Sequence, residues 1–340
     1  MKKIVTAALI SATLLSFADA KTLKDMMGRE ATIPDAPSKV YAPSPYGSYA
    51  LYAMDPALLV GWIFNIEKKN LPFLHPKMKE LPTIGRIFGA GQGANLEVLL
   101  SYKPDLILMW SHQNEFTKKE EERLKLLNAP VVYAKEESIT EYPEVFRFLG
   151  KALGKEQRGE KLAAYTQAVF EKVAKTVASV EAHKRPKVYY AEGLDGLATE
   201  CDDSIHVELL RLAGDVNIHR CHTSSHKGFE KLSMETLLQY DPEIILVQEK
   251  MFFDAIYDKP LWSNLRAVQN KRVYLIPRQP FNWFDRPPSF MRILGLQWAM
   301  AHLYPKEYEI DILKETQDFY NLFLNVSLTQ EQLQSLFTGE

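Results

Sequence analysis

The segment from Arg278 to Arg292, RQPFNWFDRPPSFMR, places arginines among aromatic residues just before a predicted helix. Arg286 directly precedes Pro287-Pro288-Ser289, where the prolines and the serine favour a helix start. A guanidinium that meets the unpaired backbone amides of a helix N-terminus would suit an anionic group. In the alternative interpretation, Arg286 pairs with Asp285 or another carboxylate and only fixes the loop, and Trp283 packs in the core.

Histidine occurs in two places that suit metal coordination. His112 directly follows an apolar run of strand length, and neutral imidazole is a ligand for Ni²⁺, Co²⁺ or iron. A lone histidine is also a common loop residue, so this prediction depends on its place at the end of a strand. The second place surrounds Cys221 with the spacing H-x2-H-x3-H, which loosely matches metal sites, although the serines and glycine nearby favour a surface loop. Its histidines are His219, His222 and His226.

The first twenty residues are typical of a secretory signal. Lys2 and Lys3 precede an apolar run from Ile4 to Phe17, and Ala18-Asp19-Ala20 forms a small-x-small cleavage site. An uncleaved anchor is the alternative, but the apolar run is shorter than the roughly 20 residues that span a bilayer. No cysteine follows the cleavage site, which excludes a lipid anchor there. We therefore expect an exported mature chain that is free and soluble.

The chain has only two cysteines, Cys201 and Cys221, twenty residues apart. Because an exported protein meets an oxidising compartment, we expect a disulfide between them, with two unpaired thiols as the alternative. A disulfide would leave no thiolate for metal binding or nucleophilic chemistry.

Length and composition predict a globular protein of about two domains, since 340 residues with 46% hydrophobic content can bury a sizeable core. The 41 basic and 43 acidic residues are mixed without long blocks of one sign. Neither nucleic acid nor an acidic lipid surface is therefore indicated as a partner.

Two stretches, 138 residues apart, share a sequence pattern. Asn95–Trp110 (NLEVLLSYKPDLILMW) and Ser233–Gln248 (SMETLLQYDPEIILVQ) agree at seven of sixteen positions, whereas unrelated stretches agree at roughly one in sixteen. Each copy starts with a helix-capping residue and continues with a short helix pattern, a break at proline and an apolar strand. The chain is therefore predicted to consist of two similar halves.

Each half is predicted to run strand, helix, strand, helix, strand, which is the alternation of a parallel α/β sheet. Right-handed crossovers would bring the carboxyl ends of the strands to one edge of each sheet. The elements expected before the two repeat copies are strands at Lys39–Ala42 and Lys187–Ala191, helices at Tyr49–Leu59 and Ile205–Ala213, and strands at Leu59–Ile63 and Val216–Ile218.

A single long helix of about 40 Å is predicted for Lys155–His183, which lacks proline and carries apolar residues three or four positions apart. As the sole link between two lobes, such a helix would be stiff and would argue against wide hinge opening. The predicted division is a signal at 1–20, an N-terminal lobe at 21–154, the linking helix at 155–184 and a C-terminal lobe at 185–340.

Taken together, the signal, the segment KDMMGREATIP at Lys24–Pro34, the opening strand VYAPSP, the two repeat copies and the central helix resemble the class III periplasmic solute-binding proteins of ABC importers. The resemblance covers essentially the whole mature chain. Within that superfamily the chain is similar to the iron-complex and cobalamin group, which captures ferric siderophores, haem, cobalamin and, in some members, nickel or cobalt chelates. The resemblance implies two Rossmann-like lobes with mostly parallel sheets, joined by one long helix, with ligand held in the cleft between them.

Glu97 and Glu235 occupy the same position in the two repeat copies, in the first turn of the short helix. A carboxylate is favoured there by the helix dipole, by roughly 0.3–1 kcal/mol, which could be its whole role. In similar proteins, glutamates at this motif contact arginines of the membrane permease. We therefore expect Glu97 and Glu235 to dock a monomeric receptor on an inner-membrane permease dimer.

Ligands of such sheets bind beyond the carboxyl ends of the strands. The loops predicted there offer aromatic and charged side chains, from which we take the candidate ligand-binding residues Tyr46, Arg86, His112, Glu192, Arg278, Trp283 and Arg286, with His112 as the one candidate metal ligand. Arg86 lies where the family often has a Gly-Gly-Trp turn before Gly91-Gln92-Gly93, and this departure leaves the ligand open.

The predicted function is a periplasmic receptor that hands a metal complex to an ABC permease. A ferric siderophore is the leading ligand, followed by a nickel or cobalt chelate of the histidine type, and by cobalamin or haem. No intrinsic cofactor is expected, because the metal arrives as part of the chelate. The competing class is an exported metal-dependent hydrolase that would use the second histidine group, with Glu230 as the nearest acid. However, the chain has no His-Glu-x-x-His motif, nucleophile elbow or phosphate loop.

Overall fold

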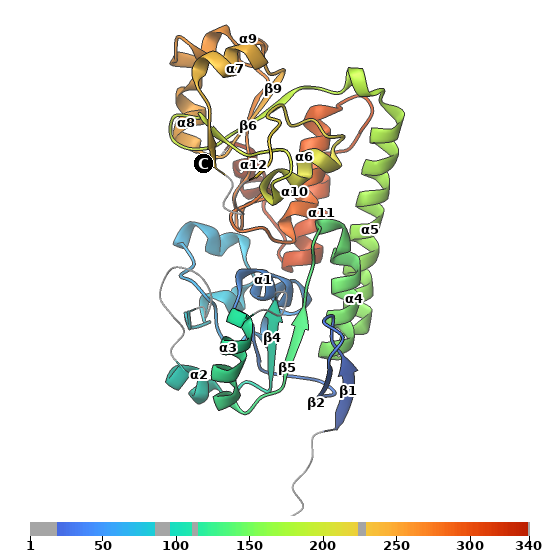
Figure 1. Ribbon diagram of the computed structural model, residues 1–340. Coiled ribbons are helices and arrows are strands. Elements are labelled where there is room, and N and C mark those ends of the chain that lie inside the picture. Colours follow the sequence, from blue (N-terminus) through green and yellow to red (C-terminus); the bar gives the residue numbers. More distant parts are fainter. Residues whose placement is uncertain (1–18, 86–95, 111–114, 224–228, 339–340) are drawn as a thin grey trace, which may run out of the picture.

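The computed structural model describes residues 19–85, 96–110, 115–223 and 229–338. Two α/β bodies are stacked end to end, and helix α5 (Glu156–Ser179) runs along one side of both (Figure 1). We call the lower body in this view the N-terminal lobe and the upper body the C-terminal lobe. The predicted fold class, two lobes with parallel sheets joined by one long helix, is confirmed. No helix within the described ranges combines the length and the apolar character needed to cross a bilayer.

Each lobe contains a parallel sheet, and the two sheets have the same strand order. The N-terminal sheet runs β3 (Val40–Tyr41), β4 (Leu106–Trp110) and β5 (Val131–Ala134), and the C-terminal sheet runs β6 (Val188–Ala191), β9 (Ile244–Val247) and β10 (Val273–Leu275). A single parallel bridge extends the first strand of each sheet, at Leu59 in one lobe and Asn217 in the other. The predicted strand at Leu59–Ile63 is thus reduced to two isolated bridges, of which the second joins Trp62 to Thr83, and the predicted strand at Val216–Ile218 is reduced to one.

The sequence repeat has the same local structure in both lobes. Its helices are α2 (Leu96–Tyr102) and α7 (Met234–Tyr240), and the residues that follow them, Lys103 and Asp241, both adopt the left-handed conformation, with φ of 50° and 42°. Two residues later, the carboxylates of Asp105 and Glu243 accept hydrogen bonds of 2.9 Å from the amides of Lys39 and Lys187. These bonds fix the repeat strand beside the first strand of each lobe.

Residues 20–34, which include the segment KDMMGREATIP, form a hairpin that closes the outer end of the N-terminal lobe. Its strands are β1 (Ala20–Lys24) and β2 (Glu30–Pro34), and β1 starts at the residue predicted to end the signal. Asp25 accepts hydrogen bonds from the amides of Met27 and Arg29 in the turn. The guanidinium of Arg29 then pairs with Glu121 on α3 (Glu115–Leu124), which ties the hairpin to the lobe.

The first predicted helix starts and ends earlier than expected. It forms α1 (Pro45–Met54), because Ser44 caps its N-terminus and Pro56 follows its end. Ile205–Val207 forms a short 3-10 turn before α6 (Glu208–Leu212). The remaining helices are α4 (Tyr142–Leu153), α8 (Lys250–Ala255), α9 (Arg266–Gln269), α10 (Met291–Leu303), α11 (Ile312–Phe319) and α12 (Gln330–Thr338), and a small antiparallel pair is formed by β7 (Ala198–Thr199) and β8 (Glu230–Lys231).

The C-terminal segment supplies a second connection between the lobes. The hydroxyl of Tyr52 on α1 donates to the carbonyl of Leu324 over 2.8 Å, and Arg158 on α5 donates to the carbonyls of Ala53 and Leu322. The ring of Phe323 packs 5.7 Å from Phe146 on α4. The linking helix is therefore not the sole tie between the lobes, contrary to the prediction, because residues after α11 return to the N-terminal lobe.

Gly159, the one glycine in the predicted linking helix, lies at the closest approach of α5 to α4. A Cβ atom at this position would lie 2.4 Å from the carbonyl oxygen of Phe146 and 2.9 Å from the Cα of Gly150. Backbone atoms cannot shift as the end of a flexible side chain can, so contacts this short would strain the packing of the two helices. The glycine thus allows two helix backbones to pack directly against each other.

Replacing Gly159 with alanine should destabilise the protein by about 1–3 kcal/mol. In an unhindered helix the same change would stabilise by about 1 kcal/mol, so the two explanations predict opposite signs. Urea unfolding followed by circular dichroism measures the difference, with Lys161→Ala on the exposed face of α5 as the control. A Gly159→Ala variant as stable as the parent would contradict the close helix contact.

Candidate ligand-binding cleft

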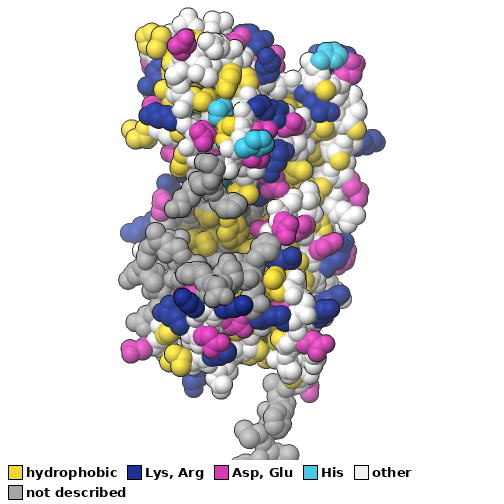
Figure 2. All heavy atoms as spheres, viewed as in Figure 1, with side chains coloured by type: hydrophobic (Ala, Val, Ile, Leu, Met, Phe, Trp, Pro, Cys, Tyr) yellow, Lys and Arg dark blue, Asp and Glu magenta, His cyan; other side chains and the backbone are white. Residues whose placement is uncertain are grey.

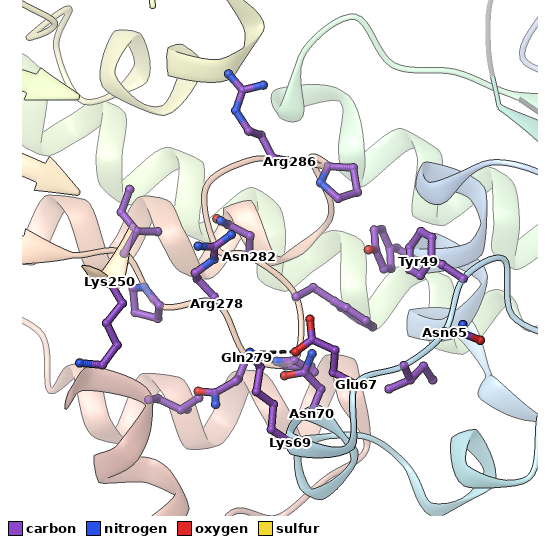
Figure 3. Close-up of a pocket in the computed structure, with 18 of the residues that line it drawn as sticks. Tyr49, Asn65, Glu67, Lys69, Asn70, Lys250, Arg278, Gln279, Asn282 and Arg286 are labelled. Carbon is purple, nitrogen blue, oxygen red and sulfur yellow. Dashed lines mark ion pairs between the residues drawn. The ribbon is translucent and has the colours of Figure 1, made fainter. Parts of the chain in front are cut away.

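The two lobes enclose a cavity of about 530 Å³, which we call the aromatic cavity. Figure 2 shows hydrophobic side chains in a hollow between the two bodies. Figure 3 shows side chains of both lobes around it. The N-terminal lobe contributes Tyr49, Trp62 and the segment 64–70 without Lys68, and the C-terminal lobe contributes Lys250, residues 275–282, Arg286, Pro287 and Leu336.

Three aromatic rings form the wall where the lobes meet. Phe281 of the C-terminal lobe lies 4.3 Å from Tyr49 and stacks on Trp62 at 5.9 Å, both measured between ring centroids. Trp62 is almost completely buried, and its Nε1 has no hydrogen-bond partner in the part of the chain that the structure describes. This wall is therefore a closely packed apolar surface, and it leaves the buried N–H of Trp62 without a partner among the described residues.

The rim of the aromatic cavity is rich in positive charge. Arg278, about half exposed, donates to the carbonyl of Gln248 over 3.1 Å and pairs with Glu249 at 3.2 Å. Lys69 and Lys250 lie on two other sides of the cavity (Figure 3). Glu67 is the one acidic residue among the described lining residues, and it pairs with Lys69 at 2.8 Å. Lys250 pairs with Asp254 at 2.8 Å, so each of these three cations has a carboxylate partner. Cations still outnumber acids among the described lining residues, which favours a solute with negative charge.

Arg286 also lines the cavity, but its charge is already compensated. Its Nε donates to Glu192 over 2.6 Å and its Nη2 to Glu192 and Glu200, while Asp285 lies at 3.5 Å. In Figure 3 the guanidinium points away from the other labelled side chains. The interpretation of Arg286 as a residue paired to carboxylates thus describes the structure, and Glu192 is its buried partner rather than a cavity wall. Burial raises the pKa of Glu192 to about 7, although Arg286 acts in the opposite direction.

Trp283, a predicted ligand-binding residue, is a core residue. Its side chain is fully buried, its Nε1 donates to the carbonyl of Gln279 over 3.1 Å, and its ring packs against Phe337 of α12. The cleft aromatic of this loop is Phe281, two positions earlier, which sequence reasoning missed together with Tyr49 and Trp62. The aromatic residues in PFNWF indicated that a ring of this loop faces the cleft, but the sequence did not show which one.

A second, smaller cavity of about 210 Å³ lies between the lobes and contains Tyr46, as predicted for a cleft residue. We call it the small polar cavity. Arg292 on α10 pairs there with Glu208 at 2.7 Å, and Glu208 accepts the amide of Ile139 from the other lobe. Burial raises the pKa of Glu136 to about 8. The described residues that line it are Tyr46, Trp110, Glu136, Glu137, Ser138, Ile139, Ile205, Glu208, Pro288 and Arg292.

The cysteines and the second histidine group lie elsewhere in the C-terminal lobe. Cys201 and Cys221 are joined by a disulfide in the structure. His219 lies beside it, with Nδ1 3.2 Å from the hydroxyl of Tyr240, and His222 is exposed next to Asp203. With both sulfurs in the disulfide, this group does not offer thiolate ligands. The predictions for Arg86, His112 and His226 fall on residues outside the described ranges.

Glu97 and Glu235 are both exposed in the first turns of α2 and α7. These helices belong to different lobes and lie toward opposite ends of the molecule, on the side away from α5 (Figure 1). The paired positions predicted from the repeat are therefore equivalent in the two lobes.

Comparison with known proteins agrees with this architecture. The family described as "Periplasmic binding protein" matches residues 78–280. The molybdate-binding protein MolA of Haemophilus influenzae is 24% identical over 96% of this chain and 97% of its own length, and the Fe(3+)-citrate-binding protein YfmC of Bacillus subtilis is 28% identical over 58% of this chain and 61% of its own. A solved ABC transporter solute binding protein from Sulfurospirillum deleyianum is 38% identical, covers 93% of this chain and 99% of its own, and superposes with a TM-score of 0.84.

Members of this family are solute-binding proteins of ABC importers, and the relatives differ in the solute that their names give. The chain belongs to the periplasmic binding protein family, as a class III solute-binding protein of an ABC importer.

Proposed function

We propose that the protein captures an anionic metal chelate, with a ferric complex as the leading ligand class, and delivers it to an ABC permease in the inner membrane. The observation that carries the proposal is the aromatic cavity, which combines stacked rings at its wall with an excess of cationic side chains at its rim. Such a lining suits a solute that is both flat and negatively charged. The proposal assigns no catalytic step to the chain.

The size of the aromatic cavity supports a chelate over a bare ion. Its volume of about 530 Å³ lies within the roughly 300–1,000 Å³ typical of sites for small organic molecules. A single metal ion or tetrahedral oxyanion would fill a small part of it. As far as the structure describes them, the lining residues include no histidine or cysteine, so a transported metal would keep the ligands of its chelator.

Two other ligand classes are supported by particular relatives. The relative that matches over nearly the full length of both chains is named for molybdate, which makes an inorganic oxyanion the second candidate. A Helicobacter pylori structure with a nickel–histidine complex shares the fold at 18% identity, and a nickel or cobalt chelate remains the third. Haem and cobalamin, named for other relatives, belong in the same binding panel.

Replacing Arg278 with glutamine should weaken binding of the preferred ferric chelate by about tenfold or more, because the side chain keeps its length but loses the charge at the rim. Isothermal titration calorimetry with ferric citrate, a ferric catecholate, nickel–histidine, haem, cobalamin and molybdate measures both the preference and the loss. Arg266→Gln is the matched control, since Arg266 is similarly exposed and paired with carboxylates but lies on α9 outside the cavity.

The control variant should bind like the parent protein. A parent protein that prefers molybdate would replace the chelate proposal with the second candidate. If the Arg278→Gln variant binds the preferred anionic chelate as tightly as the parent does, the aromatic cavity is not the binding site.

We further propose that Glu97 and Glu235 are the contacts to the permease. Exposed carboxylates at equivalent positions of two lobes suit a partner that presents basic residues at two related places, as a permease dimer would. Exposed charges of this kind contribute more to encounter and orientation than to folding stability. In the alternative explanation, each glutamate only stabilises its own helix through the helix dipole, and no partner is involved.

Changing both glutamates to lysine should abolish uptake of the radiolabelled ligand in cells, while affinity in solution changes by less than about twofold. Each single change to lysine should reduce uptake only partly. The control pair is Glu171→Lys with Glu307→Lys, two exposed glutamates remote from α2 and α7. Loss of ligand binding in solution, or normal uptake by the double variant, would argue against docking at these positions.

A further inference from the structure

The small polar cavity contains a buried cation with an unused hydrogen-bond donor. Arg292 is only 4% exposed, and its Nη2 donates to Glu208 and to the carbonyl of Ile205. Its Nε is buried and has no hydrogen-bond partner within the described residues. A buried guanidinium donor without a partner is costly, and a ligand that accepts from it would remove this cost.

Glu136 supplies a second unused polar atom to the same cavity. The side chain of Trp110 hydrogen bonds to Glu136, while Oε2 is buried and has no partner in the described part of the chain. Burial favours the neutral acid, the nearby carboxylate of Glu208 adds to this effect, and Arg292 opposes it. Tyr46 and Tyr142 are the other titratable groups that interact with Glu136. A protonated Glu136 can donate a hydrogen bond from the atom that lacks a partner.

The charge balance in this cavity differs from that of an acidic cluster. Glu208 is satisfied by Arg292 and by the amide of Ile139, so this ion pair is neutral overall. Glu137 also lines the cavity, but its carboxylate is exposed and lies 3.8 Å from Lys135. The buried or half-buried groups that remain for a ligand are then donors: the Nε of Arg292, the acid proton of Glu136 and the hydroxyl of Tyr46. A ligand that presents oxygen acceptors in several directions fits this set.

We propose that the small polar cavity is a second subsite, which binds one small tetrahedral oxyanion between the lobes through Arg292, Glu136 and Tyr46. Its volume of about 210 Å³ accommodates such an ion together with a few waters, at about 30 Å³ per water. It excludes a chelate of the size that fits the aromatic cavity. The proposal does not depend on which solute fills that larger cavity, because none of the three residues lines it.

The subsite should lose affinity as pH rises. The pKa of Glu136 is raised to about 8, so the acid proton is present at about pH 7 and absent at about pH 9.5. Above the pKa, the ionised carboxylate no longer donates and repels the anion. Sulfate and molybdate are useful probes because both keep their charge across this range, whereas phosphate does not.

Equilibrium dialysis with radiolabelled sulfate, and with molybdate measured by elemental analysis, tests the subsite in the full-length mature protein. The parent should bind one oxyanion per chain at about pH 7 and bind it about tenfold more weakly at about pH 9.5. Glu136→Gln, which keeps the size of the side chain and stays neutral, should bind with the same affinity at both pH values. Tyr46→Phe should bind several-fold more weakly at both.

Glu144→Gln on α4, an exposed position, is the control and should follow the parent at both pH values. Near-ultraviolet circular dichroism of each variant checks that its fold is retained. Absence of saturable sulfate and molybdate binding in the parent, or a Glu136→Gln variant as pH-dependent as the parent, would overturn the subsite. If the protein binds a ferric chelate but no oxyanion, the subsite is wrong and the proposed function is unaffected. If it binds an oxyanion at this subsite but no ferric chelate, the subsite is supported and the chelate proposal is wrong.

Discussion

Phe281 of the C-terminal lobe packs against Tyr49 and Trp62 of the N-terminal lobe, and the position of the whole cleft depends on this contact. The aromatic packing continues through the core, because Phe281 contacts Phe290 and Phe290 stacks on Phe323. Each buried ring removes a large apolar area from water, and each pair adds about 0.5–1.5 kcal/mol beyond that burial. Together with α5 and the returning C-terminal segment, these rings hold the lobes in one relation. We therefore regard the aromatic cavity as largely preformed.

Charge is distributed differently at the rim and at the back of the cleft. At the rim, Arg278 and Lys250 each pair with one partly exposed carboxylate, Glu249 and Asp254, and both cations stay about half exposed. Exposed pairs of this kind are weak, so these cations can still meet an anionic solute. At the back, Arg286 is enclosed by the buried carboxylates of Glu192 and Glu200, which fix the loop that carries Phe281. A buried pair of this kind contributes more to the geometry of the loop than to net stability. The same side-chain chemistry thus supports the wall at Arg286, whereas at the rim we propose that it attracts the ligand.

Much of the fold could be predicted because its signals are local. The repeat copies predicted both sheets, and the spacing of apolar residues predicted α5. The cleft was harder, because the partners of its residues are distant in sequence: Arg286 meets Glu192 from 94 residues away, and Tyr52 meets Leu324 from 272. Buried acids such as Glu192, Glu200 and Glu208 have no local pattern that separates them from surface acids. Within one loop, periodicity could not decide whether Phe281 or Trp283 faces the cavity.

The central claim is that a solute is held between the lobes, against the ring of Phe281. The most direct measurement is a crystal structure with the ferric chelate that binds most tightly, with data collected at the iron absorption edge. We expect one strong anomalous peak inside the aromatic cavity, with the chelator contacting side chains of both lobes. A peak on the surface of a single lobe, for example beside the disulfide and His219, would contradict the claim, as would an empty cavity in crystals of a protein that is saturated in solution.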